Sequence, residues 1–210
     1  MRLFVAVDLD DRVRRGVERL IGRMRAETRD GRAFRIFWVA PERLHLTLHF
    51  LANVTDEIAA RLVESVAAPI DLPAFHVVFG GMRTFSSRGR PNVIWLDIVE
   101  GNAPLIELHA VVGKRLKAVG CALEERPFSP HLTLARLRQT RGTGPKHGGK
   151  GGLSPVPLTV QGTGPVQSAE GGLSPVLVDH VTLYESQLGR DGATHTAMAT
   201  GGLRPAPTSQ

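Results

Sequence analysis

The sequence predicts an α+β fold of two pseudo-symmetric lobes, each an antiparallel β-sheet backed by helices, with a central cleft. The first indication is the tetrapeptide His-Leu-Thr-Leu at residues 45–48, which recurs unchanged at residues 131–134. Each copy lies in a short run of alternating residues, the pattern of a half-buried β-strand. The second indication is that a helical pattern and a proline-containing turn precede both copies. We therefore expect the two motif strands to meet at the centre of one domain.

The first half of the chain alternates between strand and helix patterns. The predicted elements are a strand at 2–7, a helix at about 11–28, strands at 37–39 and 44–51, and a second helix at about 55–68. In the first helix, Val13, Val17 and Leu20 recur at the spacing of one helical face. Pro41 marks the turn before the motif strand, and Thr55 has the character of an N-cap because two acidic residues follow it.

The second half repeats this alternation around the other copy of the motif. The predicted elements are strands at 75–79 and 93–99, a flexible basic loop at 85–91 between them, a third helix from about 105, and the second motif strand. The third helix is predicted from apolar residues at helical spacing and should end near Gly120, a typical C-terminal stop.

The remainder of the chain is rich in glycine and proline before a last apolar stretch. Residues 139–175 predict a long loop with one strand at 158–161, followed by a closing hairpin at 177–184 and 194–199. We expect residues 1–200 to form one domain and residues 201–210 to be a disordered tail.

Composition narrows the class of protein. The chain has a net charge of +6 carried mainly by arginine, which suits a polyanionic partner, although a solvated basic face is the simpler explanation. Its single cysteine, Cys121, excludes an intramolecular disulfide and a cysteine-rich zinc site. The apolar run at the N-terminus is interrupted by Asp8 and Asp10, and no long apolar stretch follows. We therefore expect a cytoplasmic protein that does not bind membranes.

The repeated motif predicts a catalytic site. Side chains two apart in a strand share a face, so each copy directs its histidine and threonine to one side and its leucines to the core. Two imidazoles and two hydroxyls around one cavity are suited to acid–base attack on a phosphodiester without a metal ion. A single strand histidine is usually structural, but an identical pair is not expected by chance in a chain with 8 histidines. By the same spacing, His49 should share the face of His45, too far along the strand for a shared metal.

The chain resembles the 2H phosphoesterases, and among them the bacterial and archaeal RNA 2′,3′-cyclic phosphodiesterases, or 2′-5′ RNA ligases. Several short stretches of its sequence resemble theirs and occur in the same order. The resemblance rests on both motifs and on four runs: residues 2–8, 93–96, 126–136 and 183–188. It covers most of residues 1–138 and departs from the family in the glycine- and proline-rich segment.

The resemblance implies a role for each motif residue. His45 would be the proton donor to the leaving oxygen, and His131 the proton acceptor that activates water, although the sequence alone does not assign the two roles. Thr47 and Thr133 would hydrogen-bond non-bridging phosphate oxygens. The expected substrate is RNA ending in a 2′,3′-cyclic phosphate, opened to a 2′-phosphomonoester without a cofactor or metal. Run in reverse, the same site would form a 2′-5′ linkage, and we expect a monomer.

Candidate substrate-binding residues are less specific. Arg88 and Arg90 lie in the basic loop, and Arg136 follows the second motif. Arg136 has the opposite parity to His131, so it would need a β-bulge or the end of the strand to face the cleft, and an exposed structural arginine is the alternative. Phe50 could stack on a base, as aromatic rings do in RNA-binding sites, although core packing is the favoured interpretation of this residue. Two other functions stay open: hydrolysis of another small cyclic phosphate, and nucleotide or RNA binding without turnover.

Overall fold

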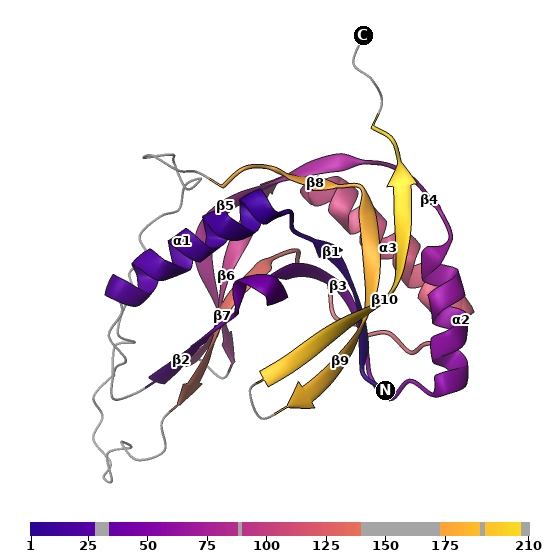
Figure 1. Ribbon diagram of the computed structural model, residues 1–210, viewed down its shortest axis with the longest axis horizontal. Helices are drawn as coiled ribbons and strands as arrows, with labels where there is room; N and C mark the ends of the chain where they lie inside the picture. Colours follow the sequence, from indigo (N-terminus) through magenta and orange to yellow (C-terminus); the bar gives the residue numbers. More distant parts are fainter. Residues whose placement is uncertain (28–33, 88–89, 140–172, 190–191, 207–210) are drawn as a thin grey trace.

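The computed structural model describes residues 1–27, 34–87, 90–139, 173–189 and 192–206, which form two five-stranded sheets (Figure 1). The first sheet has the order β3-β1-β9-β10-β4, and its strands are β1 (Leu3–Asp8), β3 (His45–Leu51), β4 (Ile70–Pro73), β9 (His180–Gly189) and β10 (Gly192–Arg204). The second has the order β2-β7-β6-β5-β8, and its strands are β2 (Phe34–Trp38), β5 (Phe75–Ser87), β6 (Arg90–Glu100), β7 (Leu132–Gln139) and β8 (Val176–Val178). All neighbours are antiparallel except β10 and β4.

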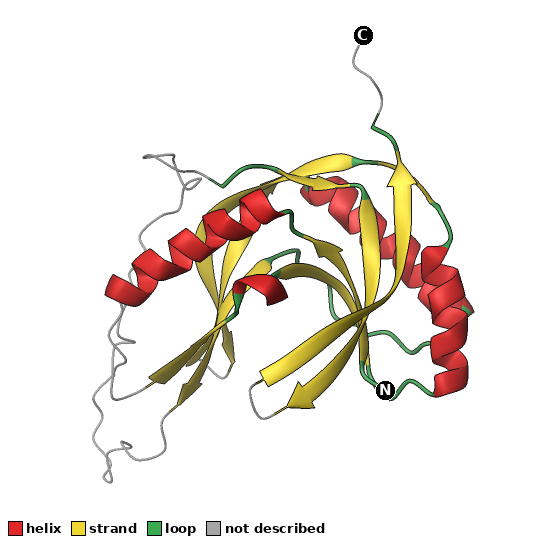
Figure 2. Cartoon of the chain, in the orientation of Figure 1, coloured by secondary structure: helices red, strands yellow, loops and turns green. Residues whose placement is uncertain are grey.

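The helices lie around the two sheets, as Figure 2 shows in red. They are α1 (Asp11–Glu27), α2 (Asp56–Ala67) and α3 (Asn102–Ala118), with a short 3-10 turn, η1 (Pro41–Arg43). Helix α1 packs beside the second sheet, with the Arg25 guanidinium 5.9 Å from the Trp38 ring of β2. Helices α2 and α3 flank the first sheet and are joined to each other by Arg115, which donates to the Ala68 carbonyl at 2.7 Å.

The α+β class and the two lobes predicted from the sequence are confirmed. Neither lobe, however, is a continuous half of the chain: β9 and β10 complete the sheet begun by β1, and β8 extends the sheet of β5. The apolar faces of both sheets contribute to one core, which includes Val5, Leu46, Leu96 and Leu132. This interleaving joins the lobes and fixes the two motif strands opposite each other, since β3 and β7 are also in contact.

Two expected irregular segments are strands instead. The basic loop at 85–91 is largely a hairpin, because Phe85 pairs with Val93 and Ser86 with Pro91, which satisfies the backbone across the strands. The tail expected from residue 201 begins inside β10. Gly201 lies so close to α2 that a Cβ there would come within 2.0 Å of the Val66 carbonyl oxygen. Glycine therefore marks close packing at this position and not disorder.

The predicted helix ends agree with the structure. The Thr55 hydroxyl accepts a hydrogen bond from the Ile58 amide at 3.3 Å, and Gly120 follows α3 with a φ of 100°. The expected strand at 158–161 and most of the glycine- and proline-rich segment lie outside the described residues. Among the described helices, none is long and apolar enough to cross a membrane.

Candidate active site

The fourth residue of each motif is a β-bulge. On β3, Val5 pairs with His49 and Ala6 with Thr47, so Leu48 is the extra residue. On β7, Ile94 pairs with Ala135 and Trp95 with Thr133, so Leu134 is the extra residue. A bulge reverses the alternation of side chains beyond it. Both copies of the motif therefore contain a β-bulge at the same residue. The bulge determines which of the following residues in the strand face the cleft.

The bulges bring Phe50 and Arg136 to the face that carries the motif histidines and threonines. Each lies five residues after its histidine, and both side chains are exposed, Phe50 by 55%. The bulge that Arg136 required is thus present. The predicted position of His49 is wrong for the same reason: it pairs with the core residue Val5 and is buried on the opposite face from His45.

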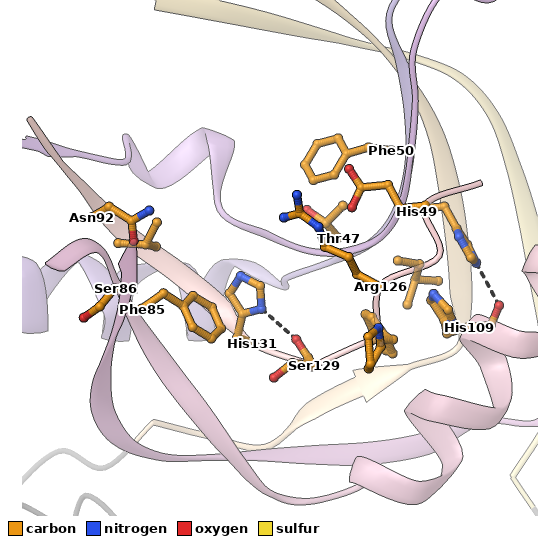
Figure 3. Close-up of a pocket in the computed structure, with 15 residues that line it drawn as sticks. Thr47, His49, Phe50, Phe85, Ser86, Asn92, His109, Arg126, Ser129 and His131 are labelled. Atoms are coloured by element: carbon orange, nitrogen blue, oxygen red, sulfur yellow. Dashed lines mark hydrogen bonds between the residues drawn. The ribbon is translucent and has the colours of Figure 1, made fainter. Parts of the chain in front are cut away.

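The two motif histidines are held in the same way. His45 Nδ1 lies 2.8 Å from the Arg43 carbonyl, and His131 Nδ1 lies 2.8 Å from the Ser129 carbonyl, the second of which is dashed in Figure 3. Because a carbonyl only accepts, each Nδ1 must carry the proton and donate it. In the neutral imidazole, Nε2 is then the free acceptor, which is the state that a general base requires.

Aromatic rings lie against both imidazoles, but from different register positions, because Phe4 pairs with Phe50 and Trp95 pairs with Thr133. Phe4, on the strand beside β3, stacks on His45 with ring centroids 4.8 Å apart, and Tyr184 stacks on Phe4 at 5.1 Å. Trp95, on the strand beside β7, lies 5.6 Å from His131. These rings remove water from the histidines and limit their rotation.

Burial affects the ionisation of both histidines. It lowers the pKa of His45 to about 4, although the Arg43 carbonyl and the carboxylate of Asp8 oppose the shift. It also lowers the pKa of His131 below 6.5, and the nearby Arg136 guanidinium acts in the same direction. Both imidazoles are therefore neutral in the unliganded protein near pH 7. A bound phosphodiester anion would favour a proton on either one.

A cavity of about 510 Å³ lies between β3 and residues 124–131. Thr47, His131 and Phe50 line it, together with the rings of His109 and Phe128. Its volume and its mixed apolar and polar lining are typical of a small-ligand site. His45 and Thr133 are not in its lining, so the cavity adjoins the motif pair on the side of His131.

The cavity also contains Arg126, which the sequence analysis missed. Figure 3 shows its side chain directed toward Thr47 and Phe50. The available signal was a cation five residues before the second motif histidine. Of the other predicted arginines, Arg88 lies outside the described residues, and Arg90 is described only in its backbone, as the first residue of β6.

A stack of three rings supports one wall of this cavity. His49 and His109 have centroids 4.0 Å apart, and His109 and Phe128 are also 4.0 Å apart. His49 Nε2 lies 2.8 Å from the His109 carbonyl, and a Cβ on Gly113 would come within 3.1 Å of the His49 ring. The stack thus connects β3, α3 and the segment that holds the Ser129 carbonyl.

The model of the 2′-5′ RNA ligase superfamily matches residues 11–143, which include both motifs and the strands that carry them. The chain belongs to this superfamily. It is 33% identical to an RNA 2′,3′-cyclic phosphodiesterase of Archaeoglobus fulgidus over 66% of this chain and 74% of that protein. It is 30% identical to the Thermotoga maritima protein of the same name over 66% and 71% of the two chains.

Solved structures agree with this assignment. A phosphoesterase crystal structure matches with a TM-score of 0.68 and 28% identity, covering 97% of this chain and 98% of that one. Escherichia coli LigT complexed with 3′-AMP matches with a TM-score of 0.68 and 27% identity, covering 96% and 97%. The family inferred from the motifs is therefore confirmed.

Proposed function

We propose that this protein is an RNA 2′,3′-cyclic phosphodiesterase that opens a terminal cyclic phosphate to a 2′-phosphomonoester. The duplicated arrangement of the two histidines carries this proposal. Each imidazole has its Nδ1 engaged by the carbonyl two residues earlier, which leaves a matched pair of Nε2 atoms for proton transfer. The names of the relatives agree with this activity.

The proposed reaction uses one histidine as a base and the other as an acid. A water oxygen attacks phosphorus, and its proton passes to Nε2 of His131. The bond between phosphorus and the 3′ oxygen breaks, and Nε2–H of His45 donates its proton to that oxygen. The two histidines therefore exchange protonation states, and the product is a 2′-phosphate. No metal ion takes part in this scheme.

The threonines and the cations have complementary roles toward the phosphate. The hydroxyls of Thr47 and Thr133 donate hydrogen bonds to the non-bridging oxygens, where negative charge increases in the transition state. Arg136 and Arg126 attract the anionic RNA end, and the exposed ring of Phe50 offers a stacking surface for a base. The phosphate charge also raises the pKa of His45, which must be protonated to act as the acid.

The test is a turnover assay with an RNA oligonucleotide that ends in a 2′,3′-cyclic phosphate, carried out with EDTA present. We expect a 2′-phosphate product that is lost in His45→Ala and His131→Ala. His76→Ala, on β5 away from both motifs, is the matched control and should keep its turnover. A 3′-phosphate product would contradict the choice of leaving oxygen. Loss of turnover with EDTA alone would contradict the metal-independent scheme.

A further inference from the structure

The two motif histidines differ in one neighbour that their symmetry does not predict. His131 is approached by Trp95 and by Phe85, whose centroid is 4.9 Å away. His45 is approached by Phe4 and by a third histidine, His195, at 5.6 Å. One catalytic imidazole therefore has apolar rings beside it, and the other has a ring that can itself take up a proton.

His195 reaches the site from the far end of the chain. It lies on β10, where it pairs with Ser186 of β9. Its ring is nearly perpendicular to that of His45, at 89°, and it also contacts the edge or face of Phe4 at 4.8 Å. The three rings thus form one cluster, in which His195 restricts the space available to the His45 imidazole.

Arg43 joins the same strand to the catalytic histidine. Its backbone carbonyl accepts the Nδ1–H of His45, and its guanidinium donates to the Ala193 carbonyl of β10 at 3.2 Å. The start of β10 is therefore attached to η1 two residues before His195. A displacement of this strand would move the hydrogen-bond acceptor of His45 as well as its neighbouring ring.

We propose that His195 is a positioning residue for His45: it holds the imidazole in place from β10 and, when protonated, opposes a second positive charge on it. This role deepens the proposed function and rests on it, because it concerns the protonation of the proposed acid. It requires no contact between His195 and the substrate.

Several charged groups favour or oppose a positive charge on His45, and His195 is one of them. The titratable and charged groups that face it are Asp8 from β1, Arg14 from α1, and His195 from β10. Asp8 favours the imidazolium, and the other two oppose it. Asp8 is itself held by Thr182 and Tyr184, whose hydroxyls donate to it at 2.7 and 2.6 Å. Burial and the Arg43 guanidinium lower the pKa of His195 itself below 6.5, so His195 gains its charge only in acid.

The test compares the wild-type protein with His195→Phe and His195→Gln by NMR titration of the histidine ring signals. Phenylalanine keeps a ring beside His45 and removes the charge, so the midpoint of His45 should rise by about half a pH unit or more. Glutamine removes the ring as well, and should broaden or displace the His45 signal even where the midpoint rises. His76→Gln, on the other sheet, is the control and should leave the His45 titration unchanged.

The acid limb of the pH profile of kcat/KM gives a second readout, because burial lowers the pKa of His45 to about 4 in the free protein. In His195→Phe it should move to higher pH with the His45 midpoint. An unchanged His45 titration in a folded His195→Phe protein would overturn the proposal, whatever happens to its turnover. Absence of turnover in the wild-type protein would contradict the proposed function instead, and the NMR titration would still decide the role of His195.

Discussion

The two motif strands have the same backbone features but different side chains around them. Both have a histidine tied to the carbonyl two residues earlier, and both have a bulge at the fourth residue. They differ in the fifth residue after the histidine, which is Phe50 in one lobe and Arg136 in the other. They differ again in the group beside the imidazole, because among the described residues His45 has another histidine next to it and His131 does not. An acid and a base need unlike environments, and here the fold duplicates the geometry while the sequence varies the environment.

The largest expected effect comes from removing either half of the histidine pair. His45→Ala and His131→Ala should each lower kcat by about 10²- to 10⁴-fold, because each removes one proton transfer. The double variant should be little worse than either single variant, since the two residues act as a unit. Single-turnover rates with the cyclic-phosphate RNA would measure this. Multiplicative losses would show that the two lobes act independently.

The threonine pair should give the next largest effect. Thr47→Val or Thr133→Val keeps the shape of the side chain and removes one hydrogen-bond donor, which should lower kcat by about a hundredfold. Thr→Ser at the same positions keeps the hydroxyl and serves as the matched control. Equal losses at the two sites would support equivalent roles in the two lobes. A change in KM alone would place the threonines in substrate binding only.

Substitutions of Arg136 and Phe50, the fifth residues after the two histidines, should separate the effect of charge on RNA binding from the effect of base stacking. Arg136→Ala should raise KM and reduce the salt dependence of RNA binding, since one cation near the phosphate is removed. Phe50→Leu should raise KM about tenfold without changing the salt dependence, because a base loses a stacking partner but no charge is altered. Binding isotherms at several salt concentrations would distinguish them. The same salt response in both variants would contradict this division of roles.

The smallest expected effect is a shift of the pH optimum when the substrate binds. Catalysis requires one histidine neutral and the other protonated, so kcat/KM should be bell-shaped. Since burial holds the pKa of His45 at about 4 and that of His131 below 6.5 in the free protein, kcat/KM should already fall as the pH rises above 6.5. The limbs of kcat should lie at higher pH, because the bound phosphate favours the imidazolium. Coincident limbs would show that the substrate does not change the ionisation of the pair.

The sequence determined much of the local structure. Alternation and helical spacing located the motif strands and α1, and Thr55 and Gly120 marked helix ends that the structure confirms. These features depend on residues close in the chain, whose side chains and caps interact within one element. The repeated tetrapeptide likewise showed which side chains form the candidate pair, because two identical strand patterns imply two identical faces.

Tertiary structure decided what depends on neighbours distant in the chain. The bulges at Leu48 and Leu134 follow from pairing with β1 and β6, so alternation within one strand could not place His49 in the core or Phe50 and Arg136 in the cleft. The position of His195 depends on β10 joining a sheet begun at residue 3. Cross-strand register is set by the partner strand, and for this reason the motif histidines were evident in the sequence while their surroundings were not.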